Sequence, residues 1–519
     1  MLHTVDISLF IAYVSGLLIV ALWISRNESN HERNTEDYFL ASKALPWWAI
    51  GASLIASNIS AEQIIGMSGS GFAIGLAIAS YEWMAALTLI VVGKYLLPVF
   101  LKNQIYTMPQ YLEQRFDNRV KTVLALFWLL VYVFVNLTAV LWLGGLAIET
   151  VAGVNWMFGM VFLAVFSIAY SLYGGLKAVA YTDILQVVLL VLGGLLLSYL
   201  ALDKVADGEG VVAGFSVLTA QLPGHFDMIL SSDNPNYKDL PGISVLIGGM
   251  LVMNFSYWGF NQYIIQRALA AKSVNEAQKG IAFAAYLKLL MPVIVVLPGI
   301  AAVLLYPDLT KPDQAYPSMM SLMPVGIKGV VFAALVAAIV SSLASMTNSI
   351  STIFTMDIYR QFQPKRSQHH YVFIGRVATL ISLVIALFMA EPLLGKFEQA
   401  FQYIQEFTGV FTPGITVIFI MGMFWKKTTS MGALAAALGS AIFSLAFRFF
   451  WPELPFMDRI GLVFVLCMLL TVIVSLNSKS SSEDSSVDLS EITFASSKGF
   501  NRAALGVMVI LIVLYGVWW

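Results

Sequence analysis

Charged residues are scarce in this chain. Only 11% of its 519 residues are Asp, Glu, Lys or Arg, whereas 59% are hydrophobic. A soluble domain usually carries about 25% charged residues, so most of this chain cannot face water. The net charge of −1 also excludes the basic surface that is typical of a nucleic-acid-binding protein.

Residues that ligate metals or do redox chemistry are also few. The chain has one cysteine, Cys467, so an internal disulfide is impossible. It has five histidines, and their spacing is not typical of a zinc site. No nucleophile and general base stand in a pattern that indicates catalysis. We therefore expect a protein that is not an enzyme.

Long apolar runs are abundant, and about fourteen of them are near the length at which a helix crosses a bilayer. We expect an all-α polytopic membrane protein. The predicted spans are residues 6–25, 46–66, 74–101, 120–149, 156–173, 178–203, 241–266, 279–306, 325–360, 371–391, 396–424, 431–450, 458–475 and 502–519.

The Lys and Arg residues of the loops indicate the orientation of these spans, because cytoplasmic loops are enriched in positive charge. If the N-terminus is outside, most of the 29 Lys and Arg residues fall in cytoplasmic loops. We expect a multi-pass protein of the cell inner (plasma) membrane, with both termini outside.

Glycine and polar residues interrupt two of the apolar runs, ASLIASNISAEQIIGMSGSG (52–71) and GGMLVMNFSYWGFNQ (248–262). These are the second and seventh predicted spans, and each opens a group of five. Discontinuous helices at matching positions favour an inverted repeat; alternatively, the polar residues only join neighbouring helices. The predicted organisation is an N-terminal helix and loop (1–45), a first repeat (46–204), an external loop (205–240), a second repeat (241–427) and C-terminal helices (428–519).

Two charged residues, Glu82 and Lys288, lie within apolar runs, where charge is costly and usually faces a cavity or a partner. With the amides of Gln63, Asn254 and Gln405, they supply the donors and acceptors that an uncharged polyol needs. The alternative is a structural ion pair.

Serines Ser341 and Ser342 interrupt another apolar run, AAIVSSLASMTNS (337–349). Their hydroxyls either bond back to their own helix or bind a hard cation together with carbonyls freed at the break in the second span.

Several segments resemble those of the bacterial sodium/galactose symporters in the sodium:solute symporter family. They are ASLIASNISAEQIIGMSGSG, SYEWM, YGGLKAVAYTDILQ, YWGFNQYIIQR, AAIVSSLASM and FQYIQEFTG. The similarity extends over nearly the whole chain, and YGGLKAVAYTDILQ matches a family signature. It implies a LeuT-type fold of two inverted five-helix repeats with additional terminal helices, and sodium-driven uptake of a sugar.

The resemblance also implies roles for individual residues. The sodium ligands would be the carbonyls of Ala56, Ile59 and Ala338 and the hydroxyls of Ser341 and Ser342, with Asp183 assisting sodium release. The sugar contacts would be Gln63, Glu82, Asn254, Lys288 and Gln405. Tyr257 would form the inner gate, and Met67, Tyr132 and Phe401 would form the outer gate.

The chain departs from the family pattern at Ala85, where the galactose symporters have a serine that contacts the sugar. The missing hydroxyl is worth about 1 kcal/mol of hydrogen bonding, so glucose or another hexose is as compatible as galactose. A symporter of another polar solute (a polyol, an amino acid or a carboxylate), a channel and a non-transporting sugar sensor remain alternatives. The sequence does not predict an oligomeric state.

Overall fold

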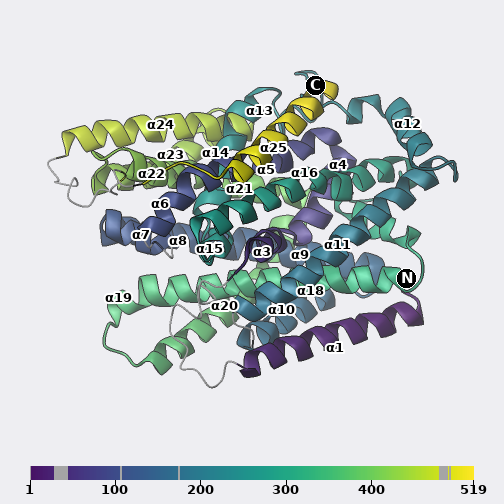
Figure 1. Cartoon of the computed structure of the whole chain (residues 1–519), viewed down its shortest axis with the longest axis horizontal. Coiled ribbons are helices and arrows are strands. Elements are labelled where there is room, and N and C mark those ends of the chain that lie inside the picture. Colours follow the sequence, from purple (N-terminus) through teal and green to yellow (C-terminus); the bar gives the residue numbers. More distant parts are fainter. Residues whose placement is uncertain are drawn as a thin grey trace.

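The computed structural model describes residues 2–27, 45–103, 105, 108–173, 176–478, 489 and 492–519. Helices form nearly all the regular structure in these ranges, where the single β contact is an isolated bridge between Leu45 and Ala271. The prediction of an all-α protein is confirmed. Figure 1 shows that most long helices run along the horizontal axis of the molecule.

The first half of the chain ends in a short helix, α12. Of the predicted N-terminal segment, 1–45, the structure describes residues 2–27 and residue 45. The helices are α1 (Thr4–Asn27), α3 (Trp47–Asn58), α4 (Met67–Ala73), α5 (Ser80–Val91), α6 (Leu97–Lys102), α7 (Met108–Arg115), α8 (Asn118–Val131), α9 (Thr138–Ala152), α10 (Trp156–Tyr173), α11 (Leu176–Val205) and α12 (Val211–Gln221).

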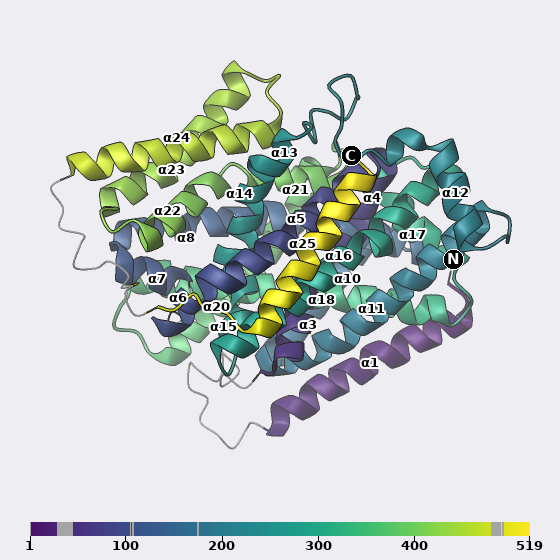
Figure 2. The ribbon, with the colours of Figure 1, turned by 45° about the horizontal axis from the view of Figure 1, so that its top comes forward.

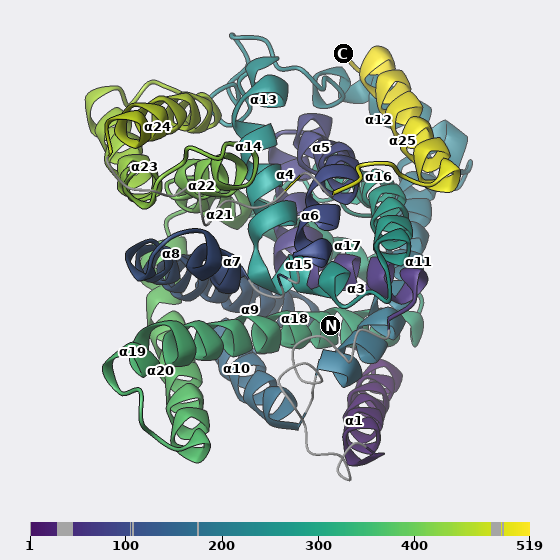
Figure 3. The same ribbon diagram turned by 60° about the vertical axis from the view of Figure 1, so that its left-hand side comes forward.

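The second half begins with a broken helix and ends in three long ones. These helices are α13 (Ser244–Ile247), α14 (Gly249–Phe255), α15 (Gln262–Leu269), α16 (Val274–Leu305), α17 (Ala315–Met319), α18 (Ile327–Thr352), α19 (Arg360–Phe362), α20 (Gln368–Leu394), α21 (Ala400–Thr408), α22 (Thr412–Phe424), α23 (Ser430–Phe450), α24 (Phe456–Asn477) and α25 (Lys498–Val517). Figure 3 shows α22, α23 and α24 together at one corner, far from α1.

Within the described residues, nine helical segments are long and apolar enough to cross a membrane, or ten if α21 and α22, which meet at 48°, form one bent span. Four predicted spans are not among these segments: 6–25, 46–66, 156–173 and 241–266. They correspond to α1, to the broken α3–α4 segment, to α10 and to the broken α13–α15 segment. A multi-pass membrane protein is thus supported, and the count of fourteen spans stays a prediction.

Burial separates central helices from peripheral ones. In the most apolar part of the α18 segment 89% of the residues are buried, compared with 17% in α25. Figure 2 shows α25 lying obliquely across the front of the bundle, over α16. The exposed apolar side chains of the peripheral helices, such as Phe388, which is 77% exposed, suit contact with lipid.

Glycines allow α16 to approach the first broken span closely. A Cβ on Gly51 of α3 would lie 2.7 Å from the carbonyl oxygen of Gly280, and one on Gly299 would lie 2.1 Å from that of Ser68. Small residues let membrane helices approach to backbone contact. This packing brings α16 alongside both α3 and α4.

A carboxylate on the first helix holds the beginning of α18. The Oδ1 atom of Asp6 accepts hydrogen bonds from the backbone N–H groups of Gly326 (2.7 Å) and Gly329 (3.1 Å). The first N–H groups of a helix have no partner within the helix, and a carboxylate satisfies them well. The N-terminal helix thus fixes the position of α18.

A second buried carboxylate holds the beginning of α21. Asp313 lies in a 3-10 turn (Pro312–Gln314), and its Oδ2 accepts a hydrogen bond from the backbone N–H of Ala400 (2.9 Å). Burial raises the pKa of the Asp313 carboxyl to about 7, although this hydrogen bond and Lys311 act in the opposite direction. A Cβ on Gly69 of α4 would lie 2.5 Å from Oδ1, so the carboxyl lies between α4 and α21.

Candidate functional site

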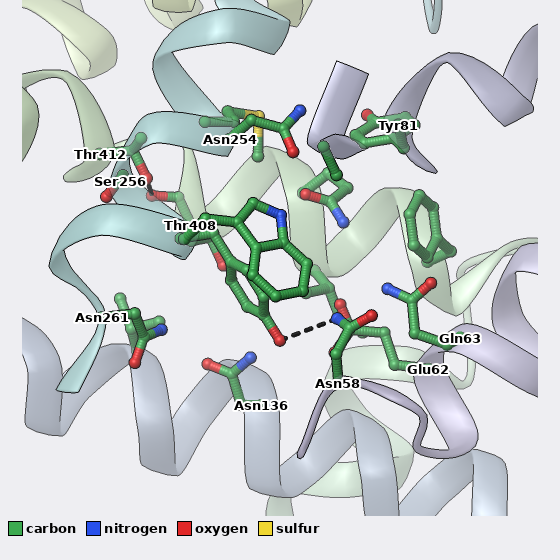
Figure 4. A pocket seen from close by; sticks show the side chains of 18 of the residues that line it. Asn58, Glu62, Gln63, Tyr81, Asn136, Asn254, Ser256, Asn261, Thr408 and Thr412 are labelled. Carbon is green, nitrogen blue, oxygen red and sulfur yellow. Dashed lines mark hydrogen bonds between the residues drawn. The ribbon is translucent and has the colours of Figure 1, made fainter. Parts of the chain in front are cut away.

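The first break lies between α3 and α4. Helix α3 ends at Asn58, Ile59 is extended (φ −72°, ψ 93°), and a π-helical turn (Glu62–Gly66) leads into α4. The hydroxyl of Ser60 accepts a hydrogen bond from the backbone N–H of Glu62 (3.3 Å), which stabilises the start of this turn. π-Helical turns are frequent at functional sites, and this one turns Glu62 and Gln63 toward a pocket (Figure 4).

The second break lies between α14 and α15. A π-helical turn (Ser256–Phe260) ends at Asn261, which is extended (φ −83°, ψ 119°), and α15 begins at the next residue. The hydroxyl of Tyr257 accepts a hydrogen bond from Nδ2 of Asn58 (3.0 Å) and shares another with the hydroxyl of Tyr263 (3.0 Å). The two breaks therefore meet, and Figure 4 draws the first of these hydrogen bonds.

A buried ion pair lies beside this junction. The ammonium of Lys288 on α16 donates to Oε2 of Glu82 on α5 (2.5 Å) and to Oδ1 of Asn58. The side chains of Lys288 and Glu82 are only 1% and 3% exposed. The ring of Trp258 lies under the ammonium, 5.1 Å from centroid to Nζ. The acid and base that sequence analysis singled out thus form an ion pair and line the pocket as well.

Amides, hydroxyls and aromatic rings line most of the pocket. All five expected sugar contacts, Gln63, Glu82, Asn254, Lys288 and Gln405, line it. Several further polar residues line the pocket but were not among the expected sugar contacts, namely Asn58, Glu62, Asn136, Ser256, Asn261, Thr408 and Thr412. This lining suits a small neutral ligand with many hydroxyls, which needs both donors and acceptors and a ring face for its C–H surface.

Phe401 lies at the beginning of α21 and packs edge-on against Tyr81 (centroids 4.9 Å apart, planes at 89°). Met67 is fully buried at the start of α4. Tyr132 also lines the pocket, but its hydroxyl donates to Oδ1 of Asn261 (2.8 Å) and its ring contacts Tyr263. The aromatic partner of Phe401 is Tyr81, which precedes Glu82 in SYEWM and was not among the residues expected at the outer gate.

The five expected sodium ligands come from α18 and from the end of α3 with the extended residue that follows it, and these two helices are in contact. Ala56, Ile59, Ala338, Ser341 and Ser342 are all buried. The carbonyls at the end of α3 lose their partners within the helix because the helix stops at Asn58.

The hydroxyls of the serine pair differ in their contacts. Ser341 donates to Oδ1 of Asp183 on α11 (2.7 Å), whereas the buried Oγ of Ser342 has no partner among the described residues. Oδ2 of Asp183 also lacks one there. Unsatisfied buried oxygens are costly, and hard cations prefer oxygen ligands. The residues present therefore fit a sodium ion.

Arg267, which comes directly after the predicted span 241–266, lies on α15 and is buried beside this group. Its guanidinium donates to the carbonyl oxygen of Tyr263 (2.8 Å) and to the hydroxyl of Ser345 on α18 (3.4 Å). It lines no part of the pocket described above. The arginine therefore connects α15 to α18 and offers no direct contact to an anionic ligand in that pocket.

Comparison with known proteins agrees with this geometry. The profile of the sodium:solute symporter family matches residues 38–439. The chain is 52% identical to the sodium/glucose cotransporter of Vibrio parahaemolyticus, an alignment that covers 100% of this chain and 99% of the relative. It is 33% identical to sodium/myo-inositol cotransporter 2 of Sus scrofa, over 87% of this chain and 71% of that protein.

Solved structures show the same fold. A sodium-coupled sialic acid symporter in a substrate-bound outward-open state superposes with a TM-score of 0.77 at 22% identity, over 92% of this chain and 98% of that one. Mhp1, a nucleobase-cation-symport-1 family transporter, superposes with a TM-score of 0.55 at 15% identity, over 87% and 99%. With a family profile that matches most of its length and a relative that shares half of its residues, this chain belongs to the sodium:solute symporter family.

Proposed function

We propose that this chain is a sodium-coupled symporter of a neutral hexose, glucose or galactose, that works by alternating access. The observation that carries the proposal is the convergence of five polar side chains from separate helices on one pocket, next to a helix break that also supplies the expected sodium ligands. The Vibrio relative, named a sodium/glucose cotransporter, supports the same substrate class.

The pocket offers matched groups for sugar hydroxyls. Glu82 accepts hydrogen bonds, Lys288 donates them, and the amides of Gln63, Asn254 and Gln405 do both. Because Lys288 is already bonded to Glu82 and Asn58, the sugar meets donors and acceptors that are held in place. A fixed site loses less conformational entropy when it binds its ligand.

Sodium and sugar are coupled through the end of α3. We infer that the carbonyls of Ala56 and Ile59 and the hydroxyls of Ser341 and Ser342 hold the ion, which fixes the end of α3 where Asn58 and the following turn enter the pocket. Each ligand then favours the same conformation, as coupling requires. The entry of one sodium ion into a negative interior releases about 2.3 kcal/mol of free energy for each 100 mV of membrane potential.

The proposal includes two gates. Tyr257, which joins the two breaks by hydrogen bonds to Asn58 and Tyr263, is the proposed inner gate. Phe401, with Met67 and its ring partner Tyr81, forms the proposed outer gate. We propose that Tyr132 acts with the inner group because its hydroxyl bonds to Asn261.

Sodium release inward is the proposed role of Asp183. Its Oδ1 already accepts a hydrogen bond from Ser341, and its Oδ2 is free of partners among the described residues. An ion that leaves the serine pair therefore has a second carboxylate oxygen within the same polar group.

The proposed membrane arrangement has fourteen spans, with inverted repeats at 46–204 and 241–427, an external loop at 205–240 and additional helices at 1–45 and 428–519. It places both termini outside the cell inner membrane. This orientation can be tested with single cysteines introduced in the proposed external loop and at each terminus. A reagent added to one side of the membrane then labels only the cysteines that face that side.

Uptake of labelled hexoses into proteoliposomes tests the function. We expect accumulation against a sugar gradient only when an inward sodium gradient is present. Equilibration without accumulation would indicate a channel, and binding without uptake would indicate a sensor. Competition by polyols such as myo-inositol, by amino acids and by carboxylates tests the alternative substrates.

A further inference from the structure

One acidic side chain of the pocket, that of Glu62, has no role in the proposed transport cycle. Glu62 lies in the π-helical turn between α3 and α4, is 7% exposed and lines the pocket. Its backbone N–H donates to Ser60, but its carboxylate makes no hydrogen bond or ion pair with any described residue. Figure 4 shows Asn58, Glu62 and Gln63 on the same side of the pocket.

The charges of the pocket do not balance. Its lining contains two carboxylates, Glu62 and Glu82, and one ammonium, Lys288; the other polar lining residues are amides and hydroxyls. Lys288 is bonded to Glu82 and to Asn58 and stands over Trp258. One carboxylate is therefore unmatched. An unpaired carboxylate away from bulk water costs several kcal/mol, so a ligand that brings a positive charge gains binding free energy.

We propose that Glu62 gives the pocket a preference for aminohexoses, in which one sugar hydroxyl is replaced by a protonated amine. The inference rests on the proposed function, since it concerns the substrate class of the same site. An ammonium is close in size to the hydroxyl it replaces, presents three donors and forms a charge-assisted hydrogen bond with a carboxylate. A hexuronate brings a second negative charge and is disfavoured.

Competition with hexose uptake tests the preference. The inhibition constants of 2-amino-2-deoxyglucose and 6-amino-6-deoxyglucose are compared with that of glucose, which carries a hydroxyl at both positions, with the full chain in proteoliposomes. We expect at least one amine to inhibit about tenfold more strongly than glucose, which is about 1.4 kcal/mol. In Glu62→Gln this ratio should fall to about 1. Glu149→Gln, a partly exposed site outside the pocket, should keep the wild-type ratio.

The outcomes distinguish a failure of the aminohexose inference from a failure of the proposed function. Equal ratios in the wild type and in Glu62→Gln would overturn the inference while leaving hexose symport intact. No uptake of any hexose by folded wild-type protein would overturn the proposed function instead. If Glu62→Gln does not fold, Glu62→Asp should retain the preference and wild-type protein should bind glucuronate more weakly than glucose. Stronger binding of glucuronate would contradict the proposed charge imbalance.

Discussion

The ammonium nitrogen of Lys288 lies 2.5 Å from a carboxylate oxygen of Glu82, and both side chains are almost completely buried. The two residues come from different helices, α16 and α5, and Asn58 at the first helix break also accepts a hydrogen bond from the lysine. Removing one member of such a pair leaves a buried charge without a partner, which typically costs about 3–5 kcal/mol.

Glu82→Gln should therefore both destabilise the protein and abolish hexose uptake. The charge of Lys288 would lose its partner, and the sugar would lose a carboxylate acceptor. Thermal unfolding in detergent and sodium-driven uptake measure the two effects. In the double variant Glu82→Gln/Lys288→Gln most of the stability should return because neither member of the pair leaves its partner's charge behind, but uptake should not. Normal uptake by the double variant would remove both residues from the sugar site.

Ser342→Ala should raise the sodium concentration needed for half-maximal uptake. The buried hydroxyl of Ser342 has no partner in the described chain, so its proposed partner is the ion. A hydrogen-bonding or ligating contact to a charged group is worth about 1.5–3 kcal/mol, which predicts a shift of roughly tenfold or more. Sodium titrations of uptake give the value. Ser349→Ala on the same helix serves as a control, and uptake of normal size without sodium would refute the assignment.

Ala85→Ser should strengthen galactose binding. Ala85 lines the pocket on the same helix as Glu82, where a hydroxyl would add one donor and acceptor for the sugar. The expected gain of about 1 kcal/mol corresponds to a five- to tenfold lower half-saturating concentration. Uptake kinetics for galactose and glucose measure it, with Ala85→Cys as a control of similar size. An unchanged value for both sugars would place the side chain outside the sugar contact.

Asp313→Asn should flatten the dependence of stability on pH. Burial raises the pKa of Asp313 from its usual 3.8 to about 7, so the folded protein binds this proton more tightly than the unfolded chain does. The contribution of Asp313 to the free energy of unfolding is complete below about pH 4. It is lost as the pH rises to about 7, and this loss lowers the free energy of unfolding by at most a few kcal/mol. Melting temperatures between pH 4 and 8 test this, with exposed Asp308→Asn as the control. The same pH profile in wild type and Asp313→Asn would contradict it.

Much of the arrangement could be predicted because polar residues in a membrane helix are costly and therefore conspicuous. Glu82 and Lys288 stood out in this way, and the glycine and polar residues at 52–71 and 248–262 marked the two segments in which the structure has helix breaks. A single asparagine in an apolar run is a weaker signal. Asn136 was passed over for that reason, and Asn261, in the interrupted segment 248–262, was not expected as a contact, although both line the pocket.

Residues whose environment depends on distant segments could not be predicted. Arg267 comes directly after the predicted span 241–266, but it lies on α15 and is buried with its guanidinium bonded to Ser345 of α18. Whether Tyr81 or Tyr132 contacts Phe401 depends on how α5 and α21 approach each other. The pairing of Asp313 with Ala400 likewise joins segments 87 residues apart. Periodicity and composition report on one segment at a time and do not contain this information.

The 48° bend between α21 and α22 has a mechanical consequence. Phe401 stands near one end of α21 and the bend lies at the other, so the nine-residue helix acts as a rigid arm about 12 Å long. A rotation of only about 10° at the bend moves the ring by about 2 Å, which is enough to break an aromatic contact, while α22 stays in place. In the proposed mechanism, this swing of one short helix would open the outer gate at Phe401.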